Sequence, residues 1–163
     1  MKAVRYLILF LFAFWAGTVF ARGGEEDRDK ALQDSISCWI EQRTFAIDAR
    51  IAYPQGGRSI PLTSPYGLRM QNDSVDVFLP YYGRAYTIPY GGGEGLRFQA
   101  PVRNYKQQFK KDSYRISFEV RTREDNYRFS LSVYTGGSAT IQVTMQNRQS
   151  IRFTGEIDAT GLQ

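Results

Sequence analysis

The sequence contains no histidine and only one cysteine, which removes most of the side chains on which catalysis depends. Without histidine there is no Ser-His-Asp or Cys-His nucleophile, no His-ligated zinc and no imidazole base. The lone Cys38 excludes a thiolate zinc site and an internal disulfide. It is either a buried small hydrophobe, which we favour, or a free thiol. We expect no catalytic residues, metal ligands or cofactor, and we leave enzymatic activity uncertain, leaning towards none.

Carboxylates are the remaining candidates for catalysis. Two acids roughly 5 to 9.5 Å apart can hydrolyse glycosides. The acids that could in principle form such a pair are Asp48, Asp73, Asp76, Glu94 and Glu119. Their spacing pairs no two of them, and Glu119 alternates with apolar residues, which predicts that it faces water. A carboxylate-dependent hydrolase is therefore only a remote alternative.

The densest group of chemistry-bearing residues consists of Tyr81, Tyr82, Arg84, Tyr86 and Tyr90. Aromatic rings and a guanidinium can stack on sugars or bases and can clamp a carboxylate or phosphate. The competing interpretation is a corner of a sheet, where tyrosines cover the sheet end and Arg84 ties down loop carbonyls. The composition favours the corner, and we keep the block as a candidate contact surface for a ligand or partner.

Charge is distributed unevenly along the chain. Residues 22–48 hold seven acidic and four basic side chains, whereas residues 49–163 hold nine acidic and fifteen basic ones. A modest basic field attracts anionic polysaccharide, lipid headgroups or nucleic acid. The basic and aromatic run at residues 105–111 resembles a nucleic-acid face only superficially. The secretory signal described next argues against a nucleic-acid partner. The partner stays unknown, with an envelope protein, a glycan or a lipid as the options.

The N-terminus has the layout of a secretory signal peptide. Lys2 and Arg5 precede an apolar run over residues 6–20, and Val19 and Ala21 are small residues where a signal peptidase requires them. We expect cleavage after Ala21. A permanent membrane anchor is the alternative, but the run is shorter than the ~20 residues of a spanning helix. We expect no transmembrane segment in the mature chain. We expect the mature chain to be periplasmic or secreted, with association with the cell envelope as a further option.

The elements that must position these residues follow from the hydrophobic pattern. Residues 1–21 are the signal, and residues 22–163 form a single β-rich domain. Within it, residues 22–43 are an acidic segment with a helix predicted over residues 27–43, because Leu32, Ile36, Trp39 and Ile40 form one apolar stripe. Residues 44–163 change to a period of two, which predicts antiparallel strands.

The clearest strands lie in the C-terminal third, at residues 114–121, 127–133, 139–145 and 151–153, and predict a four-strand meander. The middle of the chain is interrupted by prolines, with short strands predicted at residues 66–71, 75–79, 84–88, 96–99 and 102–109. The predicted fold is mainly β: a bent antiparallel sheet or partly closed barrel, with the N-terminal helix packed on it.

These residues resemble a known family. The pattern comprises Phe45-x-Ile47 leading to Tyr53-Pro54, the strand from Val75, the block Leu79-Pro80-Tyr81-Tyr82-Gly83-Arg84-Ala85-Tyr86, Leu96-x-Phe98, and closing strands with Gly136 and Gly155. Over residues 35–160 it is similar to the bacterial domain-of-unknown-function family 4251. The resemblance implies a small exported or envelope-attached Bacteroidetes protein and no established activity. Many relatives carry a lipoprotein signal, from which this chain departs at Ala21.

Taken together, the sequence predicts an exported periplasmic or envelope domain that acts without catalysis, as a binding or accessory protein. The alternative from another class is a structural envelope protein that acts through a partner chain at a sheet edge. Prolines on several candidate edge strands argue mildly against open edge pairing.

Overall fold

The computed structural model describes residues 23–84, 86 and 95–158. In this part of the chain a single α-helix, α2 (Gly23–Glu41), precedes ten strands. They are β1 (Thr44–Pro54), β2 (Ile60–Pro61), β3 (Gly67–Gln71), β4 (Ser74–Leu79), β5 (Leu96–Pro101), β6 (Arg103–Lys110), β7 (Ser113–Arg121), β8 (Asn126–Tyr134), β9 (Ser138–Met145) and β10 (Ile151–Asp158).

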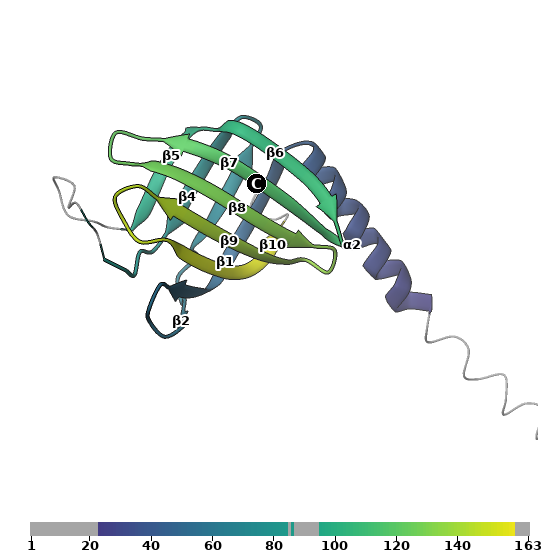
Figure 1. The fold of residues 1–163 in the computed structure, drawn as a ribbon. Helices are drawn as coiled ribbons and strands as arrows, with labels where there is room; N and C mark the ends of the chain where they lie inside the picture. The colour runs from purple at the N-terminus through teal and green to yellow at the C-terminus, as the bar shows by residue number, and fades with distance from the viewer. Residues whose placement is uncertain (1–22, 85, 87–94, 159–163) are drawn as a thin grey trace, which may run out of the picture. The chain divides into compact units, whose positions relative to one another are not determined.

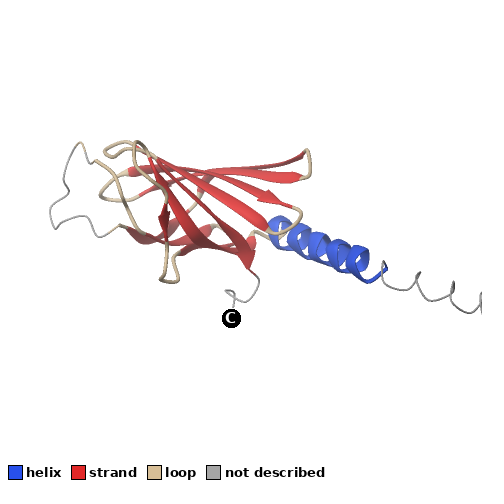
Figure 2. Cartoon of the chain, turned by 90° about the horizontal axis from the view of Figure 1, so that it is seen from below, coloured by secondary structure: helices blue, strands red, loops and turns tan. Residues whose placement is uncertain are grey.

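All strands join one antiparallel sheet in the order β5-β4-β3-β1-β10-β9-β8-β7-β6, with β2 paired to β1. The sheet curls, so that β5-β4-β3-β1 and the C-terminal strands form two layers (Figures 1 and 2). The prediction of a mainly β, bent antiparallel sheet with a C-terminal meander and a packed N-terminal helix is confirmed.

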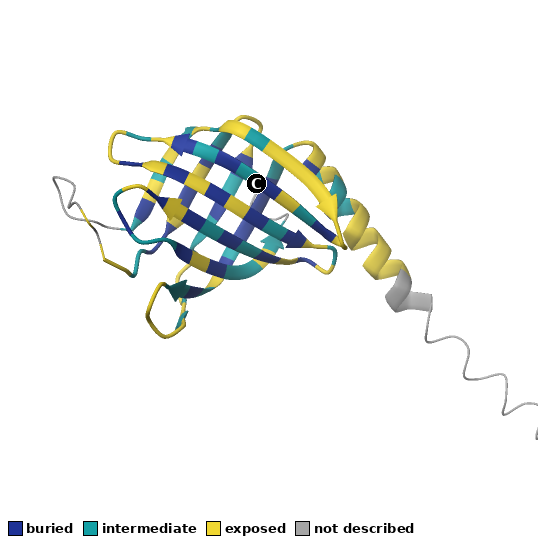
Figure 3. Ribbon diagram, in the orientation of Figure 1, coloured by how far each residue is buried: buried dark blue, intermediate teal, exposed yellow. Residues whose placement is uncertain are grey.

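The core lies inside the curl. Successive side chains of a strand point to opposite faces, and the meander strands show this as a checkerboard of buried and exposed residues (Figure 3). Four phenylalanines are at most 1% exposed. They are Phe45, Phe118, Phe129 and Phe153. The alternate positions on β7, β8 and β9 are mostly polar, so this half of the sheet presents a hydrophilic outer face.

The C-terminal part of α2 packs on the sheet through Ile36 and Ile40, which are both fully buried. The Tyr114 hydroxyl on β7 lies 2.7 Å from the Ser37 hydroxyl and adds a polar link between helix and sheet. Leu32 is 38% exposed, so the predicted apolar stripe is buried only towards the end of the helix. The expectation that Cys38 is buried was wrong: Cys38 is exposed, and its thiol accepts a hydrogen bond from the side-chain amide of Gln42.

The middle of the chain differs from the prediction in one place. Arg84 and Tyr86 do not belong to a strand of the sheet, whereas a strand was predicted over residues 84–88. Their backbone groups instead bond to the connection between β9 and β10, because the Tyr86 amide donates to the Asn147 carbonyl and the Gln149 amide to the Arg84 carbonyl. Residues 85, 87 and 88 of that predicted strand lie outside the described residues.

Strand β1 sits in the middle of the sheet and pairs with both β3 and β10. A bulge between Ala49 and Ile51 shifts its register with β10. There Gly155 faces β1 so closely that an added Cβ would lie 1.7 Å from the Asp48 carbonyl oxygen. Only a residue without a side chain allows this approach of the two backbones.

We predict that Gly155→Ala destabilises the protein, by about 3 kcal/mol, because β1 and β10 must move apart to admit the methyl group. The matched control is Gly136→Ala, since an added Cβ at Gly136 meets nothing within 4 Å. Chemical unfolding of both variants measures the difference. Equal stability of the two alanine variants would contradict the role given to Gly155.

Candidate functional site

The structure divides the tyrosine block into an anchor and an exposed part. Tyr81 is half-buried, and its hydroxyl donates to the carbonyls of Arg84 at 2.9 Å and Gln149 at 3.2 Å. Burial raises the pKa of Tyr81, against the opposing effects of the Gln149 hydrogen bond and the nearby Arg148 charge. The guanidinium carbon of Arg148, a buried residue, lies 5.3 Å from the centre of the Tyr81 ring. Tyr81 thus ties a loop to the sheet end.

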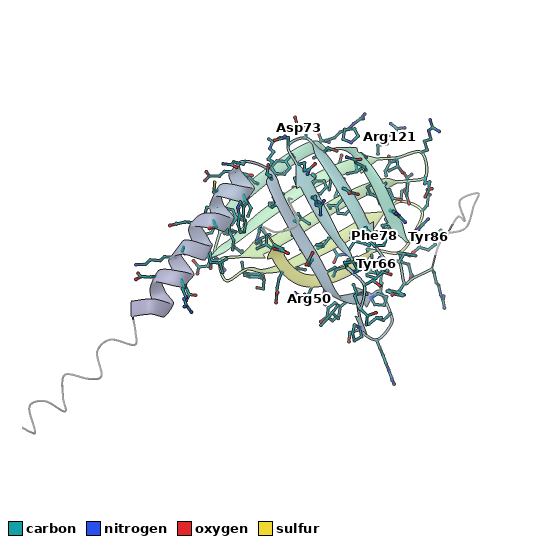
Figure 4. The ribbon with its side chains drawn as sticks, turned by 180° about the vertical axis from the view of Figure 1, so that it is seen from behind. Arg50, Tyr66, Asp73, Phe78, Tyr86 and Arg121 are labelled. Atoms are coloured by element: carbon teal, nitrogen blue, oxygen red, sulfur yellow. The ribbon has the colours of Figure 1, made fainter. Side chains whose placement is uncertain are left out.

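The rest of the block has mixed surroundings. Tyr82 is half-buried and packs against the core. Arg84 is exposed although its backbone is anchored, and Tyr86 is 71% exposed. Figure 4 shows Tyr86 at the end of the sheet. Tyr90 lies outside the described residues. Arg84 and Tyr86 therefore remain available for contact, whereas Tyr81 is committed to the fold.

A buried carboxylate completes this corner of the sheet. Asp125, which is 7% exposed, accepts hydrogen bonds from the backbone amides of Asn126, Gln146 and Asn147. It joins the β7–β8 turn to the segment after β9, next to the bonds that Tyr81 makes. The polar groups here satisfy one another, which is the behaviour expected of architecture.

The acids considered for catalysis are dispersed. Asp73 pairs with Arg43 at 2.9 Å, and Glu119 pairs with Arg128 at 3.0 Å. Asp48 and Asp76 line one hollow with Arg69, but they stand on β1 and β4 with β3 between them. Two strand spacings separate their backbones by about 10 Å before their offset along the strands is added. Glu94 lies outside the described residues.

A larger feature, absent from the sequence-based candidates, occupies the outer face of the meander. Three hollows of about 500, 480 and 810 Å³ adjoin there, since neighbouring hollows share lining residues. We call this surface the basic trough and define it by Arg103, Asn104, Lys106, Arg115, Ser117, Glu119, Arg121, Arg128, Ser130, Ser132, Thr144 and Gln146. Its lining includes five basic side chains and a single acid.

Cross-strand pairing explains the shape of the basic trough. Lys106, Ser117 and Ser130 pair in one row across β6, β7 and β8. The two serines are short, so this row is low, whereas the rows on either side carry long side chains at Arg115 and Arg128. Along β7 the lining of the trough extends from Arg115 to Arg121, across this low row and the row of Arg128, for about 20 Å at the usual rise per strand residue. It suits an extended ligand better than a compact one.

The one acid of the trough is already engaged. Glu119 accepts hydrogen bonds from Asn104 at 2.8 Å and from Arg128 at 3.0 and 3.2 Å. The Asn104 hydrogen bond, followed by those from Arg128 and by the charges of Arg128 and Lys106, holds the pKa of Glu119 below its usual range. Its negative charge offsets Arg128, and within the described chain the other four trough cations have no ion pair.

A bulge in the edge strand β6 makes the Glu119 contact possible. The register with β7 shifts between Arg103 and Lys106, and Asn104 adopts a φ of 54°. The bulge places the Asn104 amide against the carboxylate and interrupts the ladder of an otherwise exposed edge. Bulges and lysines are the usual protection of an open edge, so β6 is poorly suited to adding a strand from another chain.

Within residues 23–84, 86 and 95–158 no three His, Cys, Asp or Glu side chains gather as metal ligands would. The same part of the chain contains no helix with the length and apolarity needed to cross a membrane.

The hydrogen bonds of the Tyr81 hydroxyl should contribute to the stability of the protein. Tyr81→Phe should lower the free energy of unfolding by about 1 kcal/mol, because two carbonyls lose their shared donor. Tyr86→Phe should leave stability unchanged, since Tyr86 is largely exposed. Urea unfolding followed by circular dichroism measures both. A larger loss for Tyr86→Phe would show that the anchor has been assigned to the wrong tyrosine.

Comparison with known proteins agrees with the fold. The search of curated proteins finds no match. A crystal structure of a DUF4251 family protein from Bacteroides eggerthii DSM 20697 superposes with a TM-score of 0.62 at 18% identity. The alignment covers 78% of this chain and 87% of the other. The sequence pattern of the family, described as a domain of unknown function, matches residues 27–157. The chain therefore belongs to the DUF4251 family.

Proposed function

We propose that the mature protein is an exported, non-enzymatic binding domain of the cell envelope that holds an anionic polysaccharide in the basic trough. The observation that carries the proposal is the charge of this surface. Five cations line it, and its one acid is neutralised by Arg128. A polyanion would meet an uncompensated positive field along about 20 Å of sheet.

The remaining lining favours a polysaccharide over other polyanions. Between the cations stand hydroxyl and amide side chains, such as Ser130, Thr144 and Gln146, which hydrogen-bond to hydroxyl-rich ligands. The exposed large apolar side chains of the described chain are Leu32, Phe78, Tyr86, Phe109 and Tyr134, and none of them lines the trough. Proteins bind single-stranded nucleic acid by stacking its bases on aromatic rings, and they bind membrane surfaces by inserting apolar side chains. The lining of the trough therefore suits neither of these partners as well as it suits a polysaccharide.

The structural alternative has less support. A partner chain would add to a free sheet edge, and β6 presents a bulge and lysines there. The other edge strand, β5, ends at Pro101. Arg84 and Tyr86 remain a second contact surface in the proposal, at the end of the sheet, and a partner protein there would not compete with a ligand in the trough.

Binding of the mature chain, residues 22–163, to heparin and to polygalacturonate tests the proposal. Calorimetry at low and high salt should show affinity that falls as salt rises, with no binding to neutral dextran. Arg115→Gln/Arg121→Gln should weaken binding about tenfold, which corresponds to the loss of about 1.4 kcal/mol from two charge contacts. Glu119→Gln should strengthen it, because the trough loses its acid.

The matched control is Arg58→Gln/Lys111→Gln, which removes the same charge from residues outside the trough. It should change the affinity by less than about twofold, as expected when long-range charge is screened. An equal loss for both double variants would reduce the effect to net charge and contradict the proposal. Binding to duplex DNA alone would assign the trough to nucleic acid instead.

Export gives a separate prediction. Expression of the whole chain in a Gram-negative host should place the protein in the periplasmic fraction, with Arg22 as its first residue, because the N-terminal 21 residues have signal-peptide layout. N-terminal sequencing reads the cleavage site directly. An intact N-terminus in the membrane fraction would replace cleavage with permanent anchoring.

A further inference from the structure

A second hollow lies on the other half of the sheet, away from the meander strands of the basic trough. It measures about 250 Å³ and is lined by residues of β1, β3 and β4, together with Pro65. We call it the Gly67 hollow, defined by Asp48, Pro65, Gly67, Arg69, Asp76 and Phe78. Figure 4 shows this side of the sheet, with Phe78 and Tyr66 close together.

The floor of this hollow lies at Gly67, which has no side chain. Phe78, Gly67 and Asp48 pair in one row across β4, β3 and β1. A Cβ at Gly67 would lie 2.5 Å from the Ile47 carbonyl oxygen, so the position admits no larger residue. The Phe78 ring and the Asp48 carboxylate therefore stand as two walls with an empty place between them.

The Phe78 ring is packed against an aromatic and a cationic side chain. The Tyr66 ring lies 5.0 Å from the Phe78 ring, centre to centre, and the Arg97 guanidinium lies 5.2 Å from the same ring. Phe78 nevertheless remains 40% exposed. A fixed, exposed aromatic ring beside a hollow is a surface on which the C–H face of a sugar packs.

The polar lining offers both acceptors and donors without a net charge. Asp48 and Asp76 accept hydrogen bonds, Arg69 donates them, and Arg97 stands beside the hollow at Phe78. In the described part of the chain neither carboxylate has an ion pair. Two acids and two guanidiniums balance, so a charged ligand gains little attraction, whereas a neutral ring with several hydroxyls finds partners of both kinds.

We propose that the Gly67 hollow binds a single pyranose ring of a neutral sugar. Phe78 packs against one face of the ring, while Asp48, Asp76 and Arg69 bond to its hydroxyls. The volume is below the roughly 300 Å³ at which pockets for drug-sized ligands begin, which suits one ring. This site is independent of the basic trough, whose cations stand on β6, β7 and β8.

The test follows amide and side-chain NMR shifts of the mature chain during titration with the methyl pyranosides of glucose, galactose, mannose and N-acetylglucosamine. Titration extends to about 50 mM, since the binding of a small, solvent-exposed ligand is weak. We expect at least one of the four sugars to shift resonances of residues 47–48, 66–69 and 76–78. Phe78→Thr and Asp48→Asn should each weaken that affinity at least about fivefold, a loss of roughly 1 kcal/mol.

Three results separate this proposal from its rivals. Phe109→Thr removes another exposed phenylalanine and should leave sugar affinity unchanged. Arg115→Gln/Arg121→Gln should also leave it unchanged while weakening polyanion binding, so failure of one site is distinguishable from failure of the other. No shift with any of the four sugars, or shifts confined to other residues, would overturn the proposal. Hydrolysis of nitrophenyl glycosides that Asp48→Asn abolishes would replace binding with catalysis.

Discussion

The structure depends on the pairing of its first long strand with its last. Strand β1 binds β3 on one side and β10 on the other, and among the described strands its pairing with β10 is what links the N-terminal strands to the meander in the sheet order. Without the β1–β10 ladder, the described sheet would divide into two smaller sheets, one of β5, β4, β3, β1 and β2 and one of β10, β9, β8, β7 and β6. The close approach at Gly155 allows that ladder to form around the bulge in β1.

The curl that follows from this pairing gives the protein two outer faces with different chemistry. One carries the basic trough, whose depth comes from short serines between long basic side chains. The other carries the Gly67 hollow, whose depth comes from a glycine that the neighbouring backbone requires. In the basic trough the two serines of one cross-strand row are short, and in the Gly67 hollow a single position within a row has no side chain. A flat sheet offers few other means of making a recess.

Much of the fold was predictable because its signals are local. Alternation of apolar and polar residues identified the four meander strands, and the stripe around Ile36 and Ile40 identified the helix. The predictions failed where a residue's position depends on distant partners. Cysteine is a residue type that is often buried, but Cys38 is exposed. Arg84 does not join a strand of the sheet, and its backbone carbonyl instead accepts a hydrogen bond from Gln149, in the connection between β9 and β10.

The candidate sites were harder to predict than the fold. A cluster such as Tyr81 to Tyr90 is conspicuous in sequence because its members are neighbours in the chain. The trough residues come from four strands and, with Gln146, from the segment after β9, and only the registers between β6, β7 and β8 bring Arg103, Glu119 and Arg128 into one row. The alternation on each strand was visible beforehand as a hydrophilic face, but the balance of charge across that face was not.

The position of β1 and β10 at the centre of the sheet also governs when the fold can be completed. The edges, β5 and β6, come from the middle of the chain and are separated only by Val102. A nascent chain can therefore assemble β1, β3, β4 and β5 from nearby contacts, but the two layers close only after β10 has been made. Such non-local closure is slow. Under the proposed export, this delay keeps the chain unfolded until its last strand is available.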